Sequence, residues 1–156
     1  MRKPTKTLCV ALCLMVISFV LPAPKAFGAV APNQDLTAMS ATMVFSIVSD
    51  MMRNPYGYVG ETIKMKGLYS EFPDNNTGKT FHTCIVKDAT ACCAQGIEFE
   101  LPEGVSYPPT DSEITIVGTM DTYRNESIHI AEGIDPTQYG IILDVCILRN
   151  AELLQE

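Results

Sequence analysis

Three cysteines and a histidine lie close together between Phe81 and Gly96. His82 precedes Cys84 by two residues, and the adjacent pair Cys92 and Cys93 follows eight residues after Cys84. Thiolates combined with an imidazole bind Zn²⁺ tetrahedrally, and Cu⁺ also prefers sulfur ligands. The residue types therefore indicate a site built on thiols.

A metal site would draw on these residues and on one cysteine further along the chain. The expected ligands are Cys84, Cys92 and Cys93, with His82 or Cys146 as the fourth, and the expected supporting residues are Asp88, which would orient the site, Gln95 and Gly96. The spacing Cys-x7-Cys-Cys differs from the Cys-x2–4-Cys knuckle of many zinc sites. The pattern thus predicts a thiol site more directly than it predicts Zn²⁺.

Disulfides are the alternative use of the same cysteines. The four cysteines that follow residue 28 allow three pairings, for example Cys84 with one member of the adjacent pair and Cys146 with the other. Each bridge would stabilise the fold by about 2 to 4 kcal/mol. The protein would then be a disulfide-stapled interaction module whose barrel face binds a peptide, a glycan or a partner subunit.

Patterns typical of enzymes are absent from the sequence. It contains no Gly-x-Ser-x-Gly elbow and no Cys-x-x-Cys motif within a βαβ pattern. A thiol oxidoreductase is therefore disfavoured, and a binding function is expected in place of catalysis.

The first 28 residues read as a secretory signal. Arg2, Lys3 and Lys6 precede an apolar run from Leu8 to Leu21, and small residues lead up to Gly28. We expect cleavage after Gly28, with residues 29–34 as a tether and no integral membrane segment afterwards, because the run is shorter than the about 18 residues of a membrane helix. The predicted location is extracytoplasmic: periplasmic, secreted or at the cell surface.

The charge of the chain argues against two classes of partner. The formal net charge is −7, and it becomes −11 without residues 1–28, which hold four basic residues and no acidic ones. Nucleic acids and anionic membrane surfaces both select basic faces. We therefore expect neither as a partner.

One helix is expected in the remaining domain, residues 35–156. Asp35 is the expected N-cap of a helix over residues 36–52, in which apolar residues recur at helical spacing. The methionines of this stripe are assigned to core packing, since Met commonly fills gaps in cores.

The rest of the domain is expected to be β-structure. The expected strands cover residues 62–72, 79–88, 96–101, 113–124 and 140–148, and residues 127–131 would extend the fourth. Gly67 and Gly118 interrupt two of them, as happens where a strand bends to serve two sheets. This pattern predicts a mainly β fold, an OB-like five-stranded barrel with an N-terminal helix; a small open β-sandwich is the alternative.

The stretch from Asp88 to Phe99, together with residues 60–67 and 114–119, resembles a group of uncharacterised exported or lipid-anchored bacterial proteins, mainly from Firmicutes. More distantly it is similar to the soluble domain of putative permease-associated subunits, some of them linked to zinc-responsive operons. The element Cys-Cys-x-x-Gly, here Cys92, Cys93 and Gly96, carries the resemblance. It implies an OB-like extracytoplasmic domain that handles metal and has a metal transporter or permease subunit as its partner.

Overall fold

A computed structural model describes residues 32–75, 77–125 and 144–154. The expected signal segment, residues 29–31 of the expected tether, the expected strand extension at residues 127–131 and residues 140–143 of the expected last strand lie outside these ranges. The elements are, in chain order, β1 (Gln34–Asp35), α1 (Ala41–Arg53), a 3-10 turn (Pro55–Gly57), β2 (Thr62–Pro73), β3 (Thr80–Lys87), β4 (Ala94–Phe99), β5 (Glu113–Arg124) and β6 (Asp144–Leu154).

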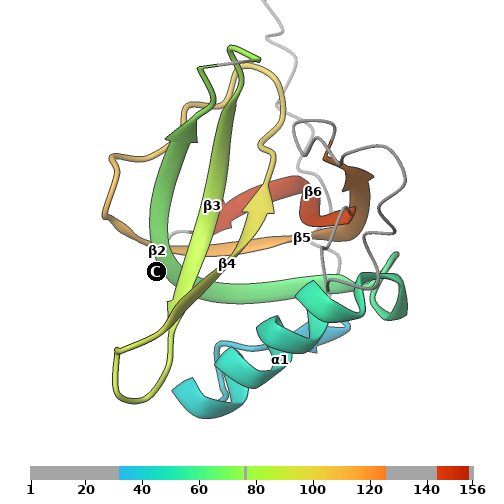
Figure 1. Ribbon diagram of the computed structural model, residues 1–156, viewed down its shortest axis with the longest axis vertical. Coiled ribbons are helices and arrows are strands. Elements are labelled where there is room, and N and C mark those ends of the chain that lie inside the picture. Colours follow the sequence, from blue (N-terminus) through green and yellow to red (C-terminus); the bar gives the residue numbers. More distant parts are fainter. Residues whose placement is uncertain (1–31, 76, 126–143, 155–156) are drawn as a thin grey trace, which may run out of the picture.

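Strands β2 to β6 form a closed barrel, seen from one side in Figure 1. β2, β3 and β4 are antiparallel neighbours, β4 pairs in parallel with β6, and β5 pairs antiparallel with both β6 and β2. The β2–β5 pairing closes the sheet on itself. The OB-like barrel expected from the sequence is confirmed, and the open sandwich is not the arrangement of the described strands.

Gly67 lies where β2 changes partners. Residues 62–68 of β2 pair with β5, whereas residues 68–73 pair with β3. A Cβ atom at Gly67 would lie 2.4 Å from the carbonyl oxygen of Ile85, so a side chain has no room at this bend. The expectation that this glycine marks a strand serving two sides of the barrel is confirmed.

Gly118 lies opposite a β-bulge. Between Val117 and Thr119 β5 advances by two residues while β6 advances by three, from Glu152 to Arg149. The extra residue is accommodated around Asn150, whose φ is +49°. The sequence therefore marked the correct place, although the bulge itself belongs to the neighbouring strand.

The helix begins later than expected. α1 starts at Ala41, and Ser40 is its N-cap, with a side-chain oxygen that accepts a hydrogen bond from the N–H of Met43. Asp35, the expected cap, lies in β1, where its carboxylate accepts from Thr37 and pairs with Lys64 at 3.3 Å. Asp35 does not cap the helix because its backbone pairs with β2 as part of β1, and because its carboxylate accepts hydrogen bonds from Thr37 in an Asx-type turn.

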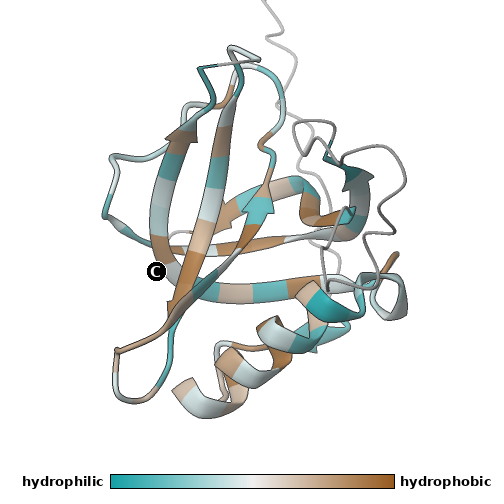
Figure 2. Ribbon diagram, in the orientation of Figure 1, coloured by the Kyte–Doolittle hydropathy of each residue, from teal (hydrophilic) through white to brown (hydrophobic). Residues whose placement is uncertain are grey.

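α1 packs on the end of the barrel beside β3 and β4, at the bottom of Figure 1. Val48 and Met51 are fully buried, whereas Met43, placed by periodicity on the buried stripe, is 54% exposed. Met51 and the partly buried Met39 confirm the packing role of the methionines in the core. Figure 2 shows the hydrophobic residues of β3 concentrated in the half that lies nearest this helix.

The strand boundaries agree closely except at the last strand. The structure begins β6 at Asp144 and continues it to Leu154, six residues beyond the expected end at Leu148. The strand continues because, beyond the bulge around Asn150, pairing with β5 resumes at Glu152. Within the described ranges, no helix is long and apolar enough to cross a membrane.

Candidate thiol site and barrel groove

A tight turn between β3 and β4 holds the adjacent cysteines. The N–H of Asp88 donates to the carbonyl of Cys93 at 3.0 Å, and the N–H of Ala91 donates to the carbonyl of Asp88 at 3.0 Å. Ala91 has a φ of +55°, in the left-handed region. This conformation reverses the chain just before Cys92 and Cys93 and leaves both exposed.

The side chain of Asp88 fixes the shape of the turn. Its Oδ1 accepts from the N–H of Cys92 at 2.9 Å and from that of Cys93 at 3.4 Å, and its Oδ2 accepts from the hydroxyl of Thr90 at 2.9 Å. Partial desolvation raises the pKa of Asp88, but these hydrogen bonds together outweigh it and hold the pKa below its ordinary value. The carboxylate is therefore anionic at neutral pH.

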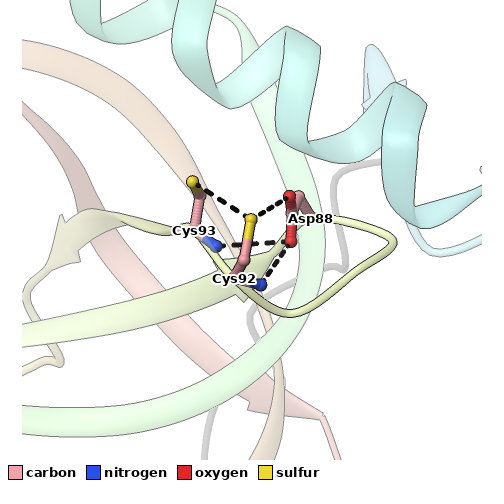
Figure 3. A group of neighbouring side chains, drawn as sticks. All are labelled: Asp88, Cys92 and Cys93. Carbon is pink, nitrogen blue, oxygen red and sulfur yellow. Dashed lines mark hydrogen bonds between the residues drawn. The ribbon is translucent and has the colours of Figure 1, made fainter.

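Two thiols and this carboxylate face one another. Figure 3 shows the sulfur of Cys92 between the sulfur of Cys93 and the carboxylate of Asp88. The sulfur of Cys92 lies 3.5 Å from that of Cys93 and 3.3 Å from Asp88 Oδ2, and all three ligand atoms lie within 4.8 Å of one another. The hydrogen bond with the neighbouring thiol of Cys92 and the electrostatic repulsion between the two side chains raise the pKa of Cys93 above its ordinary value.

These distances are close to those of a shared tetrahedral ion. With Zn–S bonds of about 2.3 Å and a Zn–O bond of about 2.0 Å, tetrahedral angles separate two sulfurs by about 3.8 Å and a sulfur from an oxygen by about 3.5 Å. The observed separations of 3.5 and 3.3 Å are each only slightly shorter. The two separations from the sulfur of Cys92 therefore fit a shared ion, and the sulfur of Cys93 lies within 4.8 Å of the Asp88 oxygen.

The structure does not bring the other two cysteines into this group. Cys84 faces the barrel core and is fully buried, which raises the pKa of its thiol to about 12. Cys146 is buried on β6, where its thiol donates to the carbonyl of Met51 on α1 at 3.1 Å, and burial raises its pKa to about 11. Both are expected ligands that packing has removed from the site, and all four described cysteines are free thiols.

His82 also lies away from the turn. It shares the strand face of Cys84, as expected from period-two alternation, but that face points toward the barrel interior. Its ring stacks on Tyr107 with centroids 3.5 Å apart, and its Nδ1 lies 2.8 Å from the hydroxyl of Tyr69. The structure thus places His82 in an aromatic cluster and not beside Cys92.

The expected supporting residues have different roles. Asp88 itself offers one of the three clustered ligand atoms, whereas it was expected only to orient the other ligands. Gln95 is hydrogen-bonded to Ser49 of α1, which anchors the base of the hairpin to the helix. A Cβ at Gly96 would lie 2.3 Å from the methyl carbon of Thr83, so this glycine serves packing between β3 and β4.

Sequence reasoning missed Thr90. Its hydroxyl lies 2.9 Å from Asp88 Oδ2 and 3.1 Å from the sulfur of Cys92, within donating distance of both. The spacing Asp-x-Thr, typical of turns in which an aspartate accepts from a hydroxyl two residues on, was the available indication.

Sequence reasoning also missed a groove of about 420 Å³ near the other end of β3. It runs over the start of β3, the end of β4 and the outer face of β6, and Tyr107 from the β4–β5 connection forms part of its wall. Its lining comes from segments far apart in the sequence. Composition and periodicity do not show that residues so far apart in the sequence meet in the fold.

Comparison with known proteins adds no family assignment: no family model matches the sequence, and no curated protein matches it either. The resemblance to exported OB-like proteins and to permease-associated subunits therefore stays a prediction.

Proposed function

We propose that this protein is an extracytoplasmic metal-binding protein whose β3–β4 turn holds a thiophilic transition metal ion, with Zn²⁺ as the preferred ion. One observation carries the proposal: Asp88, Cys92 and Cys93 present two sulfurs and an oxygen within 4.8 Å of one another, and the two separations measured from the sulfur of Cys92 are close to tetrahedral values. Hydrogen bonds between the Asp88 carboxylate and the turn backbone hold this arrangement. The site therefore needs little reorganisation to accept an ion.

The ligand set leaves one coordination position open. Zn²⁺ usually takes four ligands, and closed structural sites supply all four from the protein. The turn supplies three, and both cysteines are exposed. Water or a ligand from a second protein would complete the shell, which suits a protein that passes its ion to a partner such as a metal transporter or permease subunit.

The acidic character of the chain agrees with a cationic ligand. The formal net charge is −7, which favours the approach of a divalent cation over that of an anion. The location outside the cytoplasm rests on residues 1–28, read as a secretory signal.

Zinc titration of the reduced protein against a chromophoric chelator tests the proposal. We expect one equivalent to bind, with affinity rising with pH because each thiol must lose its proton. Cys92→Ser and Cys93→Ser should each weaken binding by about 100-fold or more, and Asp88→Asn by about tenfold, since Asn keeps the backbone hydrogen bonds but loses the charge.

Matched controls come from the rest of the chain. Asp74 accepts a hydrogen bond from the hydroxyl of Thr77 in the β2–β3 turn, much as Asp88 does from Thr90, so Asp74→Asn should leave zinc affinity unchanged. Cys146→Val removes a thiol elsewhere and should also bind normally. Zinc binding that survives in the Cys92→Ser, Cys93→Ser double variant would reject the proposed site.

A further inference from the structure

The barrel groove carries a rigid aromatic wall. The rings of His82 and Tyr107 are stacked at 11° with centroids 3.5 Å apart, and the ring of Phe99 lies 5.7 Å from that of Tyr107. The hydroxyl of Tyr107 accepts from the N–H of Leu101 at 3.1 Å, which fixes the position of its ring. These contacts hold the wall in place before any ligand arrives.

Polar groups on the outer face of β4, β5 and β6 line another part of the groove. Tyr123 donates to the carboxylate of Glu98 at 2.8 Å, and Arg149 bonds to Glu100, which directly follows β4, and to Asp121 on β5. Burial raises the pKa of Glu98, while the bond from Tyr123 and the charge of Arg149 partly offset this. Hydrogen-bonding groups of both kinds are thus fixed beside the rings.

The charges of the groove balance. Its lining includes two basic residues, Lys79 and Arg149, and two acidic residues, Glu98 and Glu100. Burial lowers the pKa of His82, which keeps the imidazole neutral at pH 7. The groove therefore differs from the chain as a whole, which is strongly acidic.

This combination disfavours two ligand classes. A polyanion such as a nucleic acid selects a net basic face. An extended peptide would find only a short free edge here, because among the groove residues of β3 only residues 80–82 pair on a single side, with β2, while pairing with β4 begins at Thr83.

We propose that the groove binds a short neutral oligosaccharide. A sugar ring offers an apolar face to aromatic side chains and a rim of hydroxyls to groups such as Glu98, Arg149 and Tyr123, and it carries no net charge. The volume of about 420 Å³ lies within the range of about 300–1,000 Å³ for small-molecule sites.

The groove is independent of the thiol turn. His82 and Asp88 lie six residues apart along β3 and its end, which corresponds to about 20 Å of extended chain. Neither the charged residues nor the rings of the groove belong to the Asp88, Cys92 and Cys93 cluster. Each proposal can therefore fail without the other.

Titration of ¹⁵N-labelled protein with sugars tests the inference. The probes are the neutral sugars cellohexaose, maltohexaose and hexa-N-acetylchitohexaose, with a trigalacturonate and a dT6 oligonucleotide as anionic comparators. We expect saturable shifts of backbone amides in residues 79–82 and 98–100 with at least one neutral sugar, and no shift of the amides of Cys92 and Cys93.

Variants then separate the groove from the rest of the surface. Glu98→Gln, which preserves shape, and Tyr107→Ala should each weaken binding about tenfold, with the amide spectrum of Glu98→Gln confirming an intact fold. Tyr56→Ala is the matched control, because Tyr56 is 67% exposed and is not part of the groove lining. The inference is overturned if no neutral sugar shifts the groove at about 10 mM, if an anionic probe binds there more tightly, or if Glu98→Gln binds as well as the unaltered protein.

Discussion

Gly96 gives the sharpest test of how the Cys-Cys-x-x-Gly element works. A Cβ atom at this position would lie 2.3 Å from Thr83 Cγ2, 3.3 Å from the carbonyl oxygen of Cys84 and 3.4 Å from Ile85 Cγ1. Carbon atoms pack best at about 3.5–4.0 Å, so the first contact is more than 1 Å too short. Gly96→Ala should therefore destabilise the barrel while leaving the thiol cluster intact.

The magnitude follows from overpacking. Inserting a methyl group into a filled site costs about 1–3 kcal/mol, and the reduced freedom of the unfolded chain returns about 0.4–1 kcal/mol. We expect a net loss of about 1–2 kcal/mol in the free energy of unfolding. Thr83 is only 8% exposed, so its methyl group has little space into which to rotate.

A double-mutant cycle isolates this contact. Thr83→Ser removes the clashing methyl and keeps the hydroxyl, at a cost of about 0.8 kcal/mol. The double variant Thr83→Ser, Gly96→Ala should then be more stable than the sum of the single effects by about 1 kcal/mol or more. Urea denaturation at unchanged m-value gives the free energies, and a zinc titration of each variant should return the wild-type affinity.

Two results would refute the reasoning. Additive single effects would show that the Thr83 methyl is not the obstacle. A Gly96→Ala protein of normal stability that has lost zinc affinity would show that the glycine serves the metal site directly, as the sequence motif suggested.

Two further predictions concern His82 and the thiols. Burial lowers the pKa of His82 in the folded protein, so the unfolded chain takes up the proton at a higher pH than the folded chain does. The free energy of unfolding should therefore fall as the pH drops below about 6.5. His82→Phe should flatten this pH dependence in urea denaturation measured from pH 5 to 7.5. In the native reduced protein, iodoacetamide at pH 8 should label Cys92 and Cys93 and spare Cys84 and Cys146. Added zinc should protect Cys92 and Cys93 from the reagent. Peptide mapping that finds Cys84 labelled as fast as Cys92 would contradict the burial of Cys84.

Much of the barrel could be predicted because its determinants are local. Period-two alternation and turn residues located the strands, and Gly67 and Gly118 identified the bend and the bulge. The start of α1 could not be predicted because Asp35 and Ser40 are both good caps. The choice between them depends on the pairing of β1 with β2, which is a tertiary contact.

The site was only partly predictable for a similar reason. Asp88, Cys92 and Cys93 lie within six residues, so one turn brings them together. Alternation showed that His82 and Cys84 share a face, but it does not say whether that face points inward. The closing of the barrel decides this, and it buries Cys84.

The position of β6 has a consequence for the order of folding. β6 lies between β4 and β5, yet it is the last of the described strands along the chain. Until it arrives, the earlier strands form at best an open sheet, β5-β2-β3-β4, in which β4 and β5 are unpaired edges. Such edges are templates for pairing with other chains. A chain synthesised from its N-terminus would expose these two edges until residues 144–154 are available to form β6, and a holding chaperone would be most useful in that interval.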